Sequence, residues 1–335
     1  MIVFNKIGLA FKLVFTYVYN SIKWLLNNTI GLLFNKKYIK FDDSNIIKES
    51  LWYKIRTIIL LLILLVLILS FKFIYDNSLG ILITLILKQI GTFINKLSPN
   101  NMYGLILIEF SKRFAGGIGV TLYLSLIGTS IGFLIALLFG FLQTLKINLY
   151  DSNLVIFLKN LVKRIIKTYV TIIRGTPMMV QAMILFWGIH SIYKWDFLTA
   201  GLVVVTINTA AYLTEVVRGG IESIEKGQLE GAVSLGLSNL QAMIYVIIPQ
   251  AIKNIMASIG NEFVINIKDT SVLSVIFVVD LFKVAKDAQN IFLDPFPPFI
   301  IAAIIYLILT STTTFILRRL EKKLDIPSQE LPSAN

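Results

Sequence analysis

Few side chains in this sequence have the chemistry of a catalyst or a metal ligand. The 335 residues include no cysteine and a single histidine, His190, so neither a thiolate site nor a histidine cluster is expected. Glu215, Glu262 and Asp269 lie in apolar surroundings, but their spacing does not suggest paired catalytic carboxylates. No G-x-x-x-x-G-K-[ST] motif occurs, so we expect no ATP hydrolysis and no cofactor or metal in this chain.

Polar side chains instead interrupt long apolar segments. Asn208, Tyr212 and Glu215 lie at spacings of four and three residues and therefore share one face of a helix. An unpaired amide at membrane depth is costly, so Asn208 is expected to face a partner or a cavity. Gln181, Asn208 and Tyr212 are predicted to contribute to a substrate path.

A second polar group lies further along the chain. Glu262 and Asp269 are seven residues apart and point the same way if the helix continues, and Lys268 can neutralise one of them. One interpretation is an internal ion pair that fixes helix packing. The other is a substrate-path site for the ammonium and carboxylate groups of a zwitterion, at a broken transporter helix.

The composition places these groups in a membrane protein. Hydrophobic residues make up 56% of the chain and charged residues only 15%, whereas soluble domains carry about a quarter charged residues. The polar segment 250–279 is read as a membrane helix with a break near its charges. Uncharged runs predict further spans at 57–71, 114–145, 175–193, 197–214 and 295–317. The fold class is therefore all-α integral membrane, with about six transmembrane helices.

The remaining segments complete the predicted organisation. The basic residues 1–56 form either an interfacial helix on the inner leaflet or a poorly ordered tail, and 57–75 is an extra transmembrane helix. Residues 76–112 are expected to be external with an interfacial helix, although 79–97 is alternatively a further span. The core is 113–320 and the tail is 321–335.

Charge predicts the orientation. Residues 143–174 hold six Lys/Arg and one acid, and the tail after Leu317 is also basic, so both are expected to be cytoplasmic, together with the N-terminus. This distribution accounts for the net charge of +12, and nucleic-acid binding is not expected.

The loop 218–249 then lies inside the cell and carries the strongest local signals. A short helix is predicted over about 228–235, and Gly236 can end it because glycine accepts the left-handed conformation. Gly231 and Ala232 are expected to leave one face of this helix almost bare, so that another protein can approach its backbone.

A second helix is predicted to follow the glycine. Ser238 can begin it, and Gln241 completes an S-x-x-Q capping box. Pro249 ends that helix or kinks it into the next span. The result is two short helices that meet at a sharp corner.

This loop resembles a known signature. Glu230-Gly231-Ala232, three residues, Gly236, nine residues and Val246-Ile247-Ile248-Pro249 are similar to the E-A-A-x3-G-x9-I-x-L-P signature of bacterial ABC importer permeases. The departures at Gly231, Val246 and Ile248 keep the size class or are smaller. In that family the loop docks in a cleft of the ATPase subunit. The resemblance therefore implies an ATPase-docking surface formed by Gln228, Glu230, Gly231, Ala232, Ser234, Leu235 and Gly236.

Other segments resemble the polar amino acid uptake branch of that family, namely 121–125, 174–177, 215–221 and 268–273. The resemblance covers about 114 to 320 and implies a five-helix core, to which this chain adds one N-terminal helix. It also implies a bacterial plasma (inner) membrane location. The implied partners are an ATP-binding ABC subunit that carries ATP and Mg, a second permease copy or homologue, an external substrate-binding protein and an amino acid.

The segment Arg174-Gly175-Thr176-Pro177 has two interpretations. Pro177 suits the first turn of a helix that Thr176 caps, while Arg174 snorkels at the membrane edge. Alternatively, Arg174, Thr176 and Pro177 serve gating or coupling, together with Glu215.

Two other function classes stand beside an importer permease. A membrane-embedded enzyme needs a catalytic constellation, and an ion-driven secondary transporter is expected to carry inverted repeats. Neither feature is visible, and neither class uses a docking loop. The leading hypothesis is a permease subunit whose two packings are biased by ATP binding to the partner.

Overall fold

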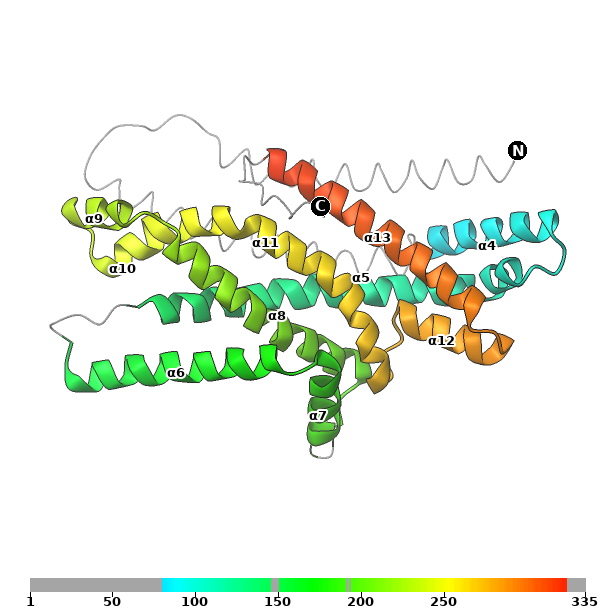
Figure 1. Ribbon diagram of the computed structural model, residues 1–335, viewed down its shortest axis with the longest axis horizontal. Helices are drawn as coiled ribbons and strands as arrows, with labels where there is room; N and C mark the ends of the chain where they lie inside the picture. Colours follow the sequence, from blue (N-terminus) through cyan, green and yellow to red (C-terminus); the bar gives the residue numbers. More distant parts are fainter. Residues whose placement is uncertain (1–79, 146–150, 191, 193, 324–335) are drawn as a thin grey trace, which may run out of the picture.

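The computed structural model describes residues 80–145, 151–190, 192 and 194–323, and the regular elements in these ranges are all helices (Figure 1). The predicted arm 1–56, the predicted helix 57–75 and most of the tail lie outside the described residues. The elements are α4 (Gly80–Leu97), α5 (Met102–Thr144), α6 (Asn153–Gly175), α7 (Met178–His190), α8 (Phe197–Glu222), α9 (Lys226–Ser234), α10 (Asn239–Ala242), the π-helix η3 (Met243–Ile247), α11 (Ile248–Asp269), the 3-10 helix η4 (Thr270–Ile276), α12 (Leu281–Phe292) and α13 (Phe296–Lys323).

Membrane-length helices dominate the described part of the chain. Five helical runs there are long and apolar enough to cross a membrane, or six if α6 and α7 count as one bent span. The predicted all-α membrane class is therefore confirmed. One of the five is α4, so residues 80–97 have the length and composition of the alternative further span. Residues 102–112 belong to the long helix α5 rather than to a separate segment.

Helices α5 and α8 pack closely because glycines on α5 receive side chains from α8. A Cβ atom at Gly132 would lie 2.9 Å from Thr209 Cβ, which leaves no room for a larger residue. Gly128 and Gly140 meet Val205 and Val217 in the same way, at a constant sequence offset. The two helices therefore run parallel, and small residues let their backbones approach closely.

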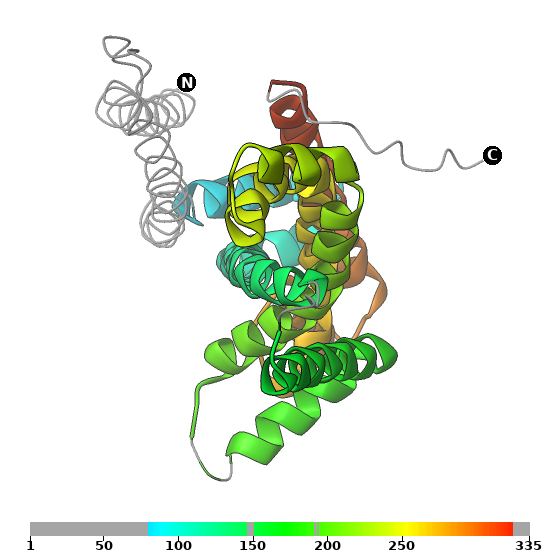
Figure 2. The ribbon, with the colours of Figure 1, turned by 90° about the vertical axis from the view of Figure 1, so that its left-hand side faces the viewer.

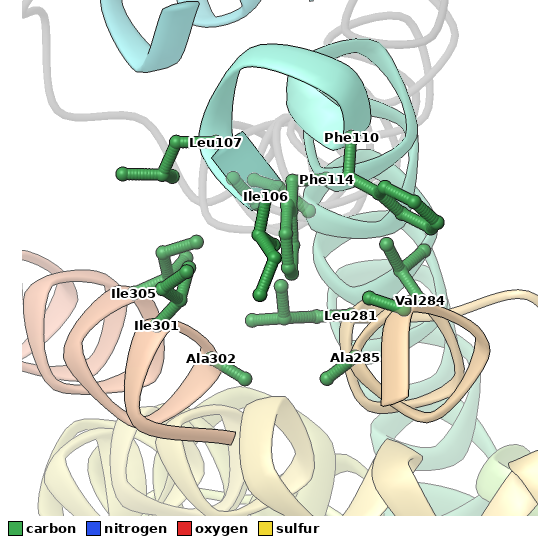
Figure 3. Close-up of a cluster of buried hydrophobic side chains, with 12 residues drawn as sticks. Ile106, Leu107, Phe110, Phe114, Leu281, Val284, Ala285, Ile301, Ala302 and Ile305 are labelled. Atoms are coloured by element: carbon green, nitrogen blue, oxygen red, sulfur yellow. The ribbon is translucent and has the colours of Figure 1, made fainter. Parts of the chain in front are cut away.

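A buried apolar cluster fastens the C-terminal helices to α5. Phe110 and Phe114 of α5 pack with Leu281 and Val284 of α12, and α13 contributes Ile301 (Figure 3). Phe114 and Leu281 are fully buried. The cluster holds α12 and α13 against one half of α5, away from the end of the molecule where α9 and α10 lie (Figure 1).

The prediction of a single straight span over 175–193 is wrong. Helix α6 occupies most of the predicted loop 143–174, and it meets the 13-residue helix α7 at an angle of 111°. Pro177 disfavours helical geometry at the preceding residue, and Thr176 is accordingly extended, with φ −125° and ψ 144°. Thr176 does not cap α7 but ends α6, where its hydroxyl donates to the Ile172 carbonyl at 2.9 Å.

The glycine packing gives a testable expectation. Gly132→Ala should lower the free energy of unfolding by about 1–3 kcal/mol, because the added methyl group overpacks the contact with Thr209. Gly116→Ala is the matched control on the same helix, since a Cβ atom there meets nothing within 4 Å. Thermal unfolding of the purified protein measures both variants. Equal stability of the two would show that close α5–α8 packing does not matter.

Candidate functional site

The loop between α8 and α11 has the predicted corner. Helix α9 ends at Ser234, and Gly236 adopts a left-handed φ of 89°. The Gly236 N–H donates to the Val233 carbonyl at 2.9 Å, and the Leu237 N–H donates to the Ala232 carbonyl at 3.3 Å. These two bonds form a Schellman motif, so the predicted glycine stop is confirmed.

The second helix of the loop begins with the predicted capping box. Ser238 Oγ accepts from the Gln241 N–H at 3.3 Å, and Gln241 Oε1 accepts from the Ser238 N–H at 2.8 Å. The helical segment does not end at Pro249. It passes from α10 into the π-helix η3, and Pro249 then lies in the first turn of α11. The predicted kink is thus a change of helical type just before the proline.

The outer surface of α9 differs in one respect from the predicted docking face. A Cβ atom at Gly231 would meet nothing within 4 Å, so the backbone is open there. Ala232, in contrast, is buried, and its prediction as part of the bare face is wrong. Gln228, Glu230, Ser234 and Leu235 are exposed, with Leu235 at 87%. Figures 1 and 2 place α9 and α10 together at one end of the molecule.

Near the end of α6 lies a group of predicted residues from three helices, which we call the charged cluster: Arg174 of α6, Tyr212 of α8, and Glu262 and Asp269 of α11. The Arg174 guanidinium lies over the Tyr212 ring, 5.3 Å from its centroid. The Glu262 carboxyl is within electrostatic range of Asp269 and of Arg174. Within this group only Arg174 and Tyr212 are in direct contact, and no ion pair within 4.0 Å joins Arg174 to Glu262 or Asp269.

The predicted internal ion pair does not form. Among the described residues, no ion pair within 4.0 Å joins Lys268 to Glu262 or Asp269, and Lys268 and Asp269 are exposed. Glu215 forms an ion pair with Arg218, about one turn further along α8, with 2.8 Å between Glu215 Oε2 and Arg218 Nη2. Helix α11 does change to the 3-10 helix η4 directly after Asp269, which is the predicted break near the charges.

Gln181 and Asn208 are bound to each other. Asn208 Nδ2 donates to Gln181 Oε1 at 3.2 Å, and both residues are at least nine-tenths buried. Gln181 Nε2 also donates to the carbonyl oxygens of Ile173 and Thr176, at 2.7 and 2.9 Å. Asn208 thus has the partner that the sequence required. The polar atoms of Gln181 are thus engaged within the chain, and its part in a substrate path stays a prediction.

Sequence reasoning missed a buried amide on α11. Asn266 is 2% exposed, and its Nδ2 donates to Thr129 Oγ1 on α5 at 2.8 Å and to Thr209 Oγ1 on α8 at 2.9 Å. It therefore links three helices through one side chain. A lone Asn in an apolar helix indicates that it has a polar partner, but sequence spacing alone does not identify that partner.

In the described ranges, no group of three His, Cys, Asp or Glu residues could hold a metal ion.

Comparisons with known proteins fit this arrangement. A family model for the binding-protein-dependent transport system inner membrane component matches residues 152–326. The chain belongs to this transport family. Its sequence is 35% identical over 216 residues to the glutamine transport system permease protein GlnP of Escherichia coli (strain K12), covering 63% of this chain and 92% of that protein. It is 37% identical over 158 residues to the arginine transport system permease protein ArtQ of Bacillus subtilis (strain 168), covering 47% and 72% of the two chains.

Two solved structures are similar to this chain. An amino acid ABC transporter crystallised with histidines aligns with a TM-score of 0.58 and 34% identity, over 65% of this chain and 97% of that one. The MetNI methionine ABC transporter in inward-facing conformations aligns with a TM-score of 0.55 and 17% identity, over 64% and 98%, which shows the fold alone. The recognition of an ABC importer permease of the amino acid type is confirmed.

A second testable prediction concerns the contribution of the buried Asn266 amide to the stability of the protein. Asn266→Ala should cost about 1–3 kcal/mol of stability, because Thr129 and Thr209 lose a buried partner. Asn254→Ala is the control on the same helix, since Asn254 makes only a 3.5 Å exposed contact to Ser223. Chemical unfolding in detergent compares the two. An equal loss in both variants would contradict the structural role of Asn266.

Proposed function

We propose that this chain is the transmembrane permease subunit of an ATP-driven importer for polar amino acids. The observation that carries the proposal is the exposed loop between α8 and α11. It presents an open backbone at Gly231, a glycine corner at Gly236 and a capped second helix, in a chain of the inner membrane component family. An open helix backbone is a surface onto which a partner protein can pack closely.

The docked partner is an ATPase subunit that holds ATP and Mg. Closure of the ATPase moves the loop, and α8 and α11 leave from its two ends. The chain alternates between two packings, and ATP binding to the partner favours one of them. The chain itself supplies no catalytic residue. A second permease copy or a homologue completes the pathway, and an external substrate-binding protein delivers the cargo.

The charged cluster suits a zwitterionic cargo. Glu262 and Asp269 can receive an ammonium group, while Arg174 and Lys268 can receive a carboxylate, and Tyr212 lies beside Arg174. Relatives named for glutamine and arginine transport support an amino acid as the cargo. Arg174, Thr176, Pro177 and Glu215 stay predicted as gating or coupling residues.

We further propose that the loop end of the molecule faces the cytoplasm. Helix α6 carries basic side chains, and α13 ends in Arg318-Arg319 followed by Glu321-Lys322-Lys323. Excess Lys and Arg mark the cytoplasmic side of bacterial inner-membrane proteins. The C-terminus is then cytoplasmic in a multi-pass inner-membrane protein. The N-terminus is also cytoplasmic if α4 is interfacial, as first predicted, whereas two crossings by 57–75 and α4 would place it outside.

A substitution at Gly231 tests the docking surface. Gly231→Trp should fold normally, because a side chain there enters open space, but it should abolish copurification with a P-loop-bearing chain and ATP-driven uptake. Affinity purification after co-expression, with uptake by reconstituted vesicles, measures both effects.

Gly219→Trp is the matched control, since Gly219 is equally open but lies on α8, ahead of the helices α9 and α10 that form the proposed docking surface. It should leave copurification intact. If Gly231→Trp copurifies and transports as well as the unsubstituted chain, docking through α9 is wrong.

A further inference from the structure

The bend between α6 and α7 is held by one side chain. Beyond Gly175 the carbonyl groups of the last turn of α6 have no helical partners. Gln181, in the first turn of α7, reaches back across the bend and donates to the carbonyls of Ile173 and Thr176 and to Thr176 Oγ1 at 2.7–2.9 Å. Gln181 thus satisfies the end of one helix from within the next.

The same side chain is connected to α8. Gln181 Oε1 accepts from Asn208 Nδ2, and the neighbouring Ile207 carbonyl accepts from the Tyr169 hydroxyl of α6 at 2.6 Å. The next residue, Thr209, binds Asn266 of α11. Three consecutive residues of α8 therefore contact α6, α7 and α11, at one level of the bundle.

Helix α8 leads directly from this level to the docking loop. Asn208 and Glu222, the last residue of α8, are separated by about 21 Å along the helix axis. The segment between them is helical throughout and packs on α5 through Val217 and Gly140. A displacement of the loop is therefore carried along α8 as the displacement of a rigid rod.

We propose that Gln181 and Asn208 are positioning residues that transmit movement of the docking loop to the α6–α7 bend. Gln181 holds the bend, and Asn208 ties the bend to α8. Arg174 lies on α6 next to the bend, so the link also places its guanidinium at the charged cluster with Tyr212. This role rests on the proposed function as an ATP-driven permease, and it replaces the substrate contact first predicted for these two amides.

The two amides have separable roles, which the test exploits. Asn208→Leu removes the link to α8 but leaves Gln181 bonded to the α6 carbonyls. Gln181→Leu removes both. Gln89→Leu on α4 is the matched control, because Gln89 is exposed.

The first measurement follows the bend itself. The chain has no cysteine, so spin labels attach only to cysteines introduced at the exposed residues Leu161 of α6 and Ile184 of α7. Pulsed electron paramagnetic resonance should give a narrow distance distribution for the unsubstituted chain, Asn208→Leu and Gln89→Leu. The distribution should shift or broaden for Gln181→Leu, and an unchanged distribution there would contradict the bend-holding role.

The second measurement uses the full complex with its ATPase partner in vesicles, with glutamine and arginine as probes. The amount of amino acid taken up per ATP hydrolysed should fall about two- to thirtyfold in Asn208→Leu, the range expected for a coupling residue, and stay unchanged in Gln89→Leu. Normal uptake per ATP in Asn208→Leu overturns the positioning role even if Gln181→Leu fails to fold. Absence of ATP-driven uptake by the unsubstituted chain contradicts the proposed function instead.

Discussion

The structure depends on one constraint: an amide or hydroxyl at membrane depth has no water to bind and must find a partner within the protein. In this chain α8 provides hydrogen-bond partners for side chains of three other helices, α6, α7 and α11. Its residues 207–209 contact Tyr169, Gln181 and Asn266, and Asn266 extends the network to Thr129 of α5. Apolar packing would allow these helices to slide, whereas directional hydrogen bonds fix their register.

The end of the molecule near the loop is built differently. Between α10 and α11 the chain adopts the π-helix η3, and Gln250 Nε2 donates to the Val246 carbonyl at 2.8 Å. An apolar cavity of about 70 Å³ lies beside this region, lined by residues of α5, α8 and α11, including Val217 and Ile252. Such π segments frequently occur at functional sites. The hydrogen-bonded level at 207–209 and the π-helix with its neighbouring cavity are thus two differently packed regions of the same bundle.

Local rules predicted the parts of this architecture that depend on neighbours in sequence. Gly236, Ser238 and Gln241 determine the corner of the loop through backbone freedom and capping, and all three behave as predicted. Gly128 and Gly132, which are four residues apart, likewise form a local pattern that lets two helix backbones approach closely. The all-α membrane class followed from the long uncharged runs.

The features that sequence reasoning missed all depend on contacts between distant residues. The sequence predicted that Asn208 has a polar partner. It did not identify Gln181, which is 27 residues away in the chain and is brought to Asn208 only by the fold. Ala232 lies on a short exposed helix, and only the packing of α9 on the rest of the protein shows that it is buried. One interpretation paired Lys268 with a carboxylate, but Lys268 is exposed and forms no such ion pair within 4.0 Å. Of the basic segment 143–174, residues 153–174 form the amphipathic helix α6 rather than a connecting loop.

Cross-linking tests directly whether the loop between α8 and α11 contacts an ATPase subunit. Because the chain has no cysteine, Ser234→Cys on exposed α9 provides a single reactive site in the assembled complex. We expect a cross-link from this site to the P-loop-bearing partner, and none from Gln89→Cys on α4. Failure of Ser234→Cys to cross-link in a complex that transports, or equal cross-linking from both sites, would contradict it.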